Sequence, residues 1–192
     1  MTTQTITFRK PMNYRDYAEL PDEVRCEVIE GEVWMSPAPE PDHQFTCGNL
    51  LFAIMAWLRE HKGVGVALTA PVDVILQDDD EQVTVFQPDL VFVAEANRQR
   101  ITRRGIEGPP DLVIEISSLS TRERDRQTKR AVYAQHGVPE YWIVDRETQT
   151  VEILRRHGKG YRRAQVAKGD EQLTTPLLPD FSLRVAAIFA TP

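Results

Sequence analysis

Three ionisable side chains, Asp89, Glu115 and Lys129, have the types and spacing that phosphodiester hydrolysis requires. Asp89 opens the apolar run DLVFV, and Glu115 stands inside a second apolar run, DLVIEIS. A carboxylate in an apolar strand is unfavourable unless a nearby cation compensates its charge. Two carboxylates suit Mg²⁺ or Mn²⁺, which prefer oxygen ligands, and an ammonium group can stabilise a phosphoryl transition state. The pattern predicts a divalent-metal phosphodiesterase.

Strand periodicity indicates which side chains the two runs present together. Asp89 shares a face with Val91, and Glu115 shares a face with Asp111. Asp111 and Glu115 are roughly 13 Å apart along one extended strand, which is too far to ligate one ion. Asp89 can approach Glu115 if the two strands are neighbours. We therefore predict that Asp89 and Glu115 hold the metal.

A helix is predicted after the second run, because Ser120 and Glu123 form a capping-box pattern. Asp125, Lys129 and Tyr133 follow at four-residue spacing, which places them on one helix face. We expect Lys129 to support the nucleophile or the transition state, with Asp125 and Tyr133 as additional site candidates.

Each of these residues also has a structural interpretation. Asp89 could only cap or terminate a strand after Pro88. Asp125 and Lys129 could form an ordinary helical ion pair, worth a few tenths of a kcal/mol. Glu115 is harder to dismiss, because a lone carboxylate in a central strand needs a raised pKa or a cation partner. A structural salt bridge remains an alternative for it.

Two more candidates lie upstream of these runs. Glu27 is on the first strand of a predicted hairpin and could be a third acidic ligand or face solvent. His43 opens a predicted long helix and could ligate a metal, act as a base, or be an exposed polar residue. No G-x-S-x-G elbow, Walker loop, H-E-x-x-H motif or paired-cysteine zinc spacing supports a different chemistry.

The formal net charge is −6, which argues against tight, non-specific duplex binding, because phosphate neutralisation drives such binding. Basic residues nevertheless gather near the candidate site, between positions 98 and 130. Such runs are typical of solvated faces, yet their position also suggests phosphate contacts. The candidates for phosphate contact are Arg103, Arg104, Arg122 and Arg126.

The 192 residues, 41% of them hydrophobic, suit a single domain over 1–192. No apolar run approaches the roughly 20 residues that span a bilayer, so no membrane partner is expected. The start, MTTQTITFRK, lacks the apolar core of a secretory signal, and Cys26 and Cys47 have no disulfide-rich pattern. We expect a cytoplasmic location.

The predicted elements are a short helix over 13–20, hairpin strands at 26–29 and 32–36, and a helix from Asp42 to about His61. Four strand-like runs follow: VGVAL, PVDVIL, VTVFQPDLVFV and PDLVIEIS. After the second long helix come strands YWIVD and TVEILRR. The tail from Arg162 has no strong pattern. This order predicts an α/β fold with a central sheet flanked by helices.

Three stretches, CEVIEGEVWMSPAPEPDHQ, QPDLVFV and PPDLVIEISSLSTRERDRQTKRAVYAQHGVPEYWIVD, resemble the Uma-two family of endonucleases. This family is a branch of the PD-(D/E)XK, restriction-endonuclease-like superfamily. The resemblance implies a mixed central sheet flanked by helices with an N-terminal β-hairpin decoration. It also implies a nuclease-like core over about 42–156, an N-terminal extension over 1–41 and a C-terminal segment over 157–192.

The resemblance assigns Asp89 to the first acidic position and Glu115 to the second. The common pattern has a lysine two residues after the second acid, where this chain has Ser117, which is a further candidate for the site. The resemblance suggests that Lys129 replaces that lysine from the adjacent helix. It implies a divalent-metal nuclease that forms a homodimer, but it does not supply a substrate. We expect the reaction to be hydrolysis of DNA phosphodiesters. The alternatives are a non-catalytic domain that binds nucleic acid or protein, and a hydrolase of RNA or small phosphodiesters.

Overall fold

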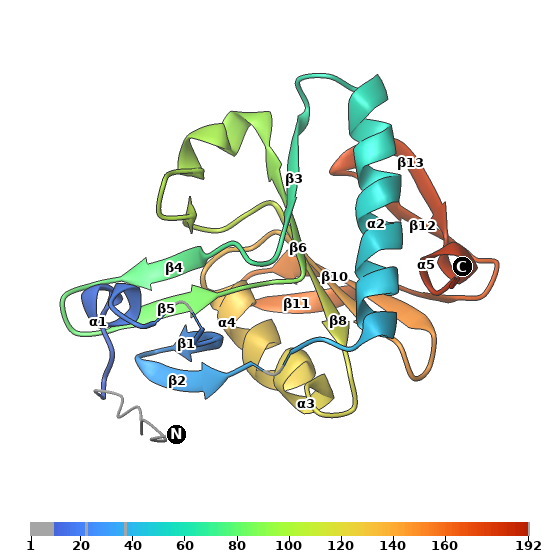
Figure 1. Ribbon diagram of the computed structural model, residues 1–192. Helices are drawn as coiled ribbons and strands as arrows, with labels where there is room; N and C mark the ends of the chain where they lie inside the picture. Colours follow the sequence, from blue (N-terminus) through green and yellow to red (C-terminus); the bar gives the residue numbers. More distant parts are fainter. Residues whose placement is uncertain (1–9, 22, 37, 192) are drawn as a thin grey trace.

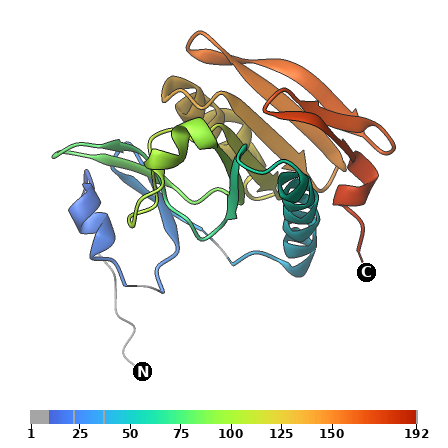
Figure 2. The ribbon, with the colours of Figure 1, turned by 90° about the horizontal axis from the view of Figure 1, so that it is seen from above.

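The computed structural model describes residues 10–21, 23–36 and 38–191, which form two main β-sheets and a separate hairpin (Figures 1 and 2). The larger sheet has the order β11-β10-β9-β8-β6-β3, with bounds β3 Gly65–Thr69, β6 Leu90–Ala94, β8 Leu112–Ser117, β9 Glu140–Asp145, β10 Thr150–His157 and β11 Gly160–Lys168. The smaller sheet has the order β2-β1-β5-β4-β7, with bounds β1 Cys26–Ile29, β2 Glu32–Met35, β4 Val74–Asp78, β5 Val83–Phe86 and β7 Ile106–Glu107. The hairpin pairs β12 Gln172–Thr175 with β13 Leu178–Arg184.

The helices are mostly short, apart from the 20-residue α2. Their bounds are α1 Tyr14–Ala18, α2 Pro41–Glu60, α3 Arg122–Arg124, α4 Arg130–Gln135 and α5 Val185–Ile188, with a 3₁₀ segment η1 Glu95–Arg100 and a π-helical turn η2 Asp125–Lys129. Segments α3, η2 and α4 follow one another without a break. They form the connection between β8 and its parallel neighbour β9.

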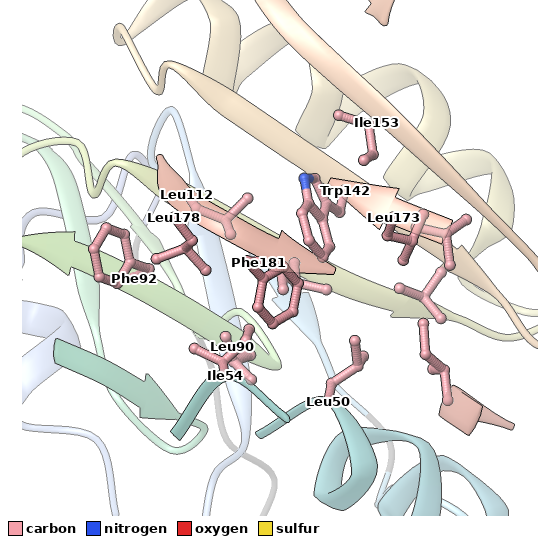
Figure 3. Packing of buried hydrophobic residues seen from close by; sticks show 14 of the residues in the cluster. Leu50, Ile54, Leu90, Phe92, Leu112, Trp142, Ile153, Leu173, Leu178 and Phe181 are labelled. Atoms are coloured by element: carbon pink, nitrogen blue, oxygen red, sulfur yellow. The ribbon is translucent and has the colours of Figure 1, made fainter. Parts of the chain in front are cut away.

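Hydrophobic side chains cover both faces of the larger sheet. On one face, Leu50 and Ile54 of α2 pack with Leu90, Leu112 and the β12–β13 hairpin (Figure 3). On the opposite face, valines of β6 and β8 pack with α4 and with strands of the smaller sheet. The predicted alternation of side chains along β6 and β8 is therefore confirmed.

Strands β6 and β8 are antiparallel neighbours, with Leu90 opposite Ile114. The run VTVFQPDLVFV, however, is divided at Pro88 between two sheets, because β5 belongs to the smaller sheet and β6 to the larger. Proline lacks the backbone N–H that a continuous strand would need. Asp89 consequently stands where the chain passes from one sheet to the other.

The N-terminal hairpin agrees with the prediction: β1 and β2 pair around Glu30 and Gly31, which both have positive φ angles (50° and 78°). Strand β1 also pairs with β5, so the hairpin is an integral part of the smaller sheet. The short helix α1 starts after Asn13, whose side chain caps it.

One expectation about an element was wrong, and one region had no prediction. Ser120 does not cap the helix after β8: Thr121 occupies the N-cap position, without a side-chain cap bond, and Ser120 Oγ instead lies 2.9 Å from Ser118 Oγ. The tail without a strong pattern contains ordered strands, and β11 is an edge strand of the larger sheet. The main sheet therefore extends into 157–192, beyond the predicted core.

Candidate active site

Glu115 lies near the end of β8 and is 4% exposed. Lys129 Nζ and Tyr133 Oη both donate to its Oε1 atom, each at 2.7 Å. The helical spacing explains this convergence, because η2 and α4 present Lys129 and Tyr133 to the same strand. The cation partner that a buried carboxylate in this strand requires is therefore Lys129.

Glu27 reaches the same lysine from the smaller sheet. Lys129 Nζ donates to Glu27 Oε1 at 2.8 Å, and the backbone N–H of Gln87 donates to the same oxygen at 3.2 Å. The other oxygen, Oε2, is buried without a hydrogen-bond partner among the described residues, and Arg124 Nη2 lies 3.8 Å from it. A hairpin from one sheet thus supplies a second acid to a site built mainly on the other.

Asp89 lies beside the C-terminal end of β8. Its Oδ2 accepts a hydrogen bond from the backbone N–H of Ile116 at 2.7 Å, which extends the β6–β8 ladder beyond the Leu90–Ile114 pair. Its Oδ1 lies 3.2 Å from His43 Nε2, on the first turn of α2. One oxygen thus has the strand-ending role that the sequence left open, while the other oxygen faces a histidine.

Ser117, at the position where the resembled pattern has lysine, donates from Oγ to Asp125 Oδ2 at 2.7 Å. Asp125 and Lys129 are both buried, and among the ion pairs of the described residues they are not joined to each other. The simple helical ion pair is therefore not formed, since each residue contacts a partner on another element.

Burial raises the pKa of Glu115 to about 8; Lys129 opposes this rise, and the nearby carboxylates Glu27, Asp125 and Asp89 add to it. Burial acts in the opposite sense on Lys129, but Glu115 and Glu27 outweigh it and raise the pKa of the lysine. Lys129 therefore stays protonated, and Glu115 is harder to ionise than an exposed glutamate.

A cavity of about 600 Å³ opens between α2, the start of α3 and the two sheets. Its lining includes the predicted residues Glu27, His43, Asp89, Glu115, Asp125 and Lys129. Ser117 and Tyr133 are outside the lining but contact it, because Ser117 donates to Asp125 and Tyr133 donates to Glu115. The structure therefore brings together all eight candidates that were named outside the phosphate-contact group.

The four arginines named for phosphate contact are outside this lining. Arg104 binds Asp78 at 2.5 Å near the β4–β5 turn. Arg122 and Arg126 bind Asp145 and, in the case of Arg126, also Glu152. Arg103 follows η1 in the sequence, on the same loop as Arg104.

Three arginines that were not predicted as site residues also line the cavity: Arg25, Arg124 and Arg146. Arg124 is the most informative of them, because its Nε atom is buried without a hydrogen-bond partner among the described residues. Arg124 belongs to the basic run around Lys129. Its position on the helix relative to Lys129 was the one feature of the sequence that could have indicated its place in the cavity. Arg25 and Arg146 are brought in from distant parts of the chain.

The donor set fits a hard divalent cation. Six acids and four Lys or Arg residues line the cavity, so acidic groups are in excess; the acids are Glu27, Glu40, Asp89, Glu115, Asp125 and Glu147. In the described ranges, no group of three or more His, Cys, Asp or Glu side chains is arranged to hold a metal ion by itself. Mg²⁺, however, is commonly bound by one or two carboxylates together with waters and substrate phosphates. Asp89 and Glu115 suit that mode of binding.

Comparison with known proteins agrees with this architecture. The family model described as "Uma2: Putative restriction endonuclease" matches residues 14–186. A crystal structure at 1.96 Å from Anabaena variabilis, described as "a putative nuclease belonging to DUF820", has a TM-score of 0.75 and 20% sequence identity, and the match covers 93% of this chain and 98% of that one. No curated protein matches the sequence. The structural likeness shows a restriction-endonuclease-like fold, and the chain belongs to the Uma2 (Uma-two) family of nucleases.

Proposed function

We propose that this protein is a divalent-metal-dependent endonuclease that hydrolyses phosphodiester bonds of DNA. The observation that carries the proposal is the convergence of Asp89, Glu115 and Lys129 on one cavity. Asp89 directly precedes β6, Glu115 lies on the neighbouring strand β8, and Lys129 lies on the helical segment that follows β8. A purely structural salt bridge would not need the further acids, Glu27 and Asp125, that surround the same lysine. Membership of a nuclease family supports the reaction class.

Asp89 and Glu115 are the residues that would hold Mg²⁺ or Mn²⁺. When bound, such an ion polarises the phosphodiester and makes a hydroxide nucleophile available near neutral pH. The carboxylate of Glu115 is oriented by Tyr133, whose hydroxyl donates to it. His43 and the Ile116 amide fix the two oxygens of Asp89 in a similar way.

Lys129 has the geometry of a group that stabilises a transition state. Its ammonium carries three N–H donors, of which Glu115 and Glu27 accept two. The third can donate to a phosphate oxygen that enters the cavity. Because Glu115 and Glu27 keep the lysine protonated, this donor is present at neutral pH. Arg124 lies beside it and can contact a second phosphate oxygen.

Plasmid nicking in the presence of Mg²⁺ tests the proposal directly. We expect wild-type protein to nick supercoiled DNA, and Glu115→Gln and Lys129→Met each to reduce the rate by about 10²-fold or more, as removal of a transition-state partner does. The matched control is Glu81→Gln, at an exposed glutamate in the β4–β5 turn. Equal nicking by wild type and Glu115→Gln would contradict the proposal.

The same assay separates the alternative functions. Cleavage of RNA, or of a small phosphodiester such as bis(p-nitrophenyl) phosphate, in place of DNA would keep the chemistry and change the substrate. Binding of DNA without cleavage by any divalent cation would favour a non-catalytic domain. The arginines in the cavity, Arg25, Arg124 and Arg146, favour a polyanionic substrate in every case.

A cytoplasmic location is also part of this proposal. The two cysteines, Cys26 and Cys47, are both free, which fits a reducing compartment. Among the helices in the described ranges, none is long and apolar enough to cross a membrane.

A further inference from the structure

Two of the arginines that were expected to contact phosphate are held by buried acids. Arg122 contacts Asp145 at 2.8 Å, and Arg126 contacts Glu152 at 2.7 Å. Both acids are buried, so loss of the arginines would leave uncompensated negative charge in the interior. Arg122 and Arg126 therefore serve the fold, and a substrate phosphate cannot draw them away at little cost.

Arg146, in the turn between β9 and β10, is held differently. It lines the cavity, and its side chain is 15% exposed, whereas its partners Glu40 and Asp42, at the start of α2, are 74% and 71% exposed. Nη1 and Nη2 lie 3.3 and 3.4 Å from one oxygen of Glu40, and Nη2 lies 3.7 Å from Asp42 Oδ2. Close charge-assisted contacts measure about 2.7–2.9 Å. An arginine of the cavity is thus paired through long contacts with acids that lie in solvent.

These contacts of Arg146 can be exchanged. Ion pairs of exposed acids add little to stability, because water and salt screen the charges. Glu40 presents a single oxygen to both terminal nitrogens of Arg146, so the two parallel hydrogen bonds that a guanidinium can form with one anion are not made. A phosphodiester has two free oxygens that match this fork. It can therefore replace Glu40 and Asp42, which remain hydrated after they separate from the arginine.

The position of Arg146 indicates which phosphate it would meet. Strands β8 and β9 are parallel neighbours, with Glu115 opposite Ile143. Arg146 is three residues further along than Ile143, which is roughly 10 Å in an extended strand. This separation is larger than one phosphate group. A DNA strand whose scissile phosphate lies at Glu115 therefore presents a different, flanking phosphate to Arg146.

We propose that Arg146 binds a phosphate that flanks the scissile phosphodiester, and that Glu40 and Asp42 compete with the nucleic acid for its guanidinium. This inference rests on the proposed function, because it names a substrate contact of the same site. Arg146 adds to the affinity for DNA, and the two acids reduce it. Removal of the arginine and removal of the acids should therefore shift DNA binding in opposite directions, which a loss of folding cannot do.

Fluorescence anisotropy with a fluorescein-labelled DNA duplex measures these shifts. Ca²⁺ replaces Mg²⁺, and a gel verifies that the DNA stays intact. Arg146→Gln should raise the dissociation constant about tenfold, as loss of a charge-assisted hydrogen bond does, and should reduce the slope of log affinity against log salt concentration by about one. Glu40→Gln combined with Asp42→Asn should lower the dissociation constant about threefold.

A control separates this effect from the net charge of the protein. Asp170→Asn combined with Glu171→Gln makes the same change in charge at two exposed acids after β11, outside the cavity lining. It should change the dissociation constant less than about twofold, because salt screens distant charges. In protein that carries Arg146→Gln, removal of Glu40 and Asp42 should no longer tighten binding. Equal tightening with and without Arg146, or equal tightening by the control pair, would overturn the inference.

The binding result is separable from the nicking result. Wild-type protein that binds DNA in this pattern but does not nick it would keep the contact at Arg146 and lose the proposed reaction. Wild-type protein that nicks DNA, together with Arg146→Gln that binds DNA like wild type, would keep the reaction and overturn the contact. Absence of DNA binding by wild type would overturn both.

Discussion

Lys129 is the residue on which the site depends most. It is 3% exposed, and its ammonium group contacts two buried carboxylates, those of Glu115 and Glu27. A buried ion pair adds little net stability, but loss of one partner leaves an uncompensated charge in the interior. The same arrangement that keeps the lysine protonated therefore makes the fold sensitive to its removal.

Substitution Lys129→Met should reduce the free energy of unfolding by about 3–5 kcal/mol, because Glu115 and Glu27 lose their shared cation. Chemical denaturation measures the change. The control, Lys168→Met at an exposed lysine on β11, should differ from wild type by less than about 0.5 kcal/mol. Adding Glu115→Gln to Lys129→Met should recover part of the loss. A cost below about 1 kcal/mol for Lys129→Met would contradict the account.

Tyr133 allows the catalytic and structural effects of a hydroxyl to be separated. Tyr133→Phe removes the donor to Glu115, and Tyr161→Phe removes a donor to the Val138 carbonyl, remote from the cavity. We expect each change to cost about 1 kcal/mol in stability, since each removes one hydrogen bond. Only Tyr133→Phe should also slow nicking. If both variants nick DNA like wild type, Tyr133 does not position Glu115 for the reaction.

At the scale of elements, the helical segment from α3 to α4 is tied to β9 and β10 by ion pairs. Arg126 binds both Asp145 and Glu152, and Arg122 and Arg163 bind one acid each. Burial tends to raise the pKa values of the two acids, but hydrogen bonds and the arginines outweigh it and lower both. These contacts hold the helix that presents Lys129.

This attachment predicts loss of stability in acid. Because the folded-state pKa values of Asp145 and Glu152 are below their unfolded values, the ion pairs stabilise the fold above a pH of about 4 and are lost as the pH falls through the lowered pKa values. The free energy of unfolding, measured between pH 6 and pH 3, should fall less steeply in Glu152→Gln than in wild type. Glu81→Gln should keep the wild-type slope. Parallel slopes for wild type and Glu152→Gln would exclude this contribution.

The elements that the sequence predicted well are those with a strong local pattern. Alternation of apolar residues in β6 and β8, and the spacing along α2, depend on burial of one face and are visible along the chain. Strand β11 was missed, because an edge strand that is largely exposed carries arginine, glutamine and lysine where a central strand carries valine. The division of the run VTVFQPDLVFV at Pro88 could not be predicted, because it depends on the tertiary structure: β5 joins the smaller sheet and β6 joins the larger.

Prediction of the site residues was limited in the same way, because contacts set by local spacing could be predicted and contacts set by long-range folding could not. The pairing of Glu115 with Lys129 was open to prediction, because one helix follows one strand directly and its phase is fixed. The ion pair between Glu27 and Lys129 joins positions 102 residues apart, across two sheets. Arg25 and Arg146 also reach the cavity from distant parts of the chain, so no local spacing in the sequence predicts them.

At the scale of the whole molecule, the cavity lies where the two sheets meet. The crossover at Asp89 joins the sheets, and Glu27 of the smaller sheet reaches Lys129, which also binds Glu115 of the larger. The protein has a net charge of −6, so its affinity for a polyanion depends on local cations. Lys129 and the arginines of the cavity supply this positive charge beside the acids.

The proposed reaction requires that Asp89 and Glu115 together bind a divalent cation in this cavity. The most direct measurement is anomalous diffraction from crystals of the protein soaked in Mn²⁺. We expect a single strong anomalous peak within ligand distance of one carboxylate oxygen from Asp89 and one from Glu115, and no such peak in Glu115→Gln crystals. A soaked wild-type crystal with manganese bound only elsewhere, or with this position empty, would contradict this expectation.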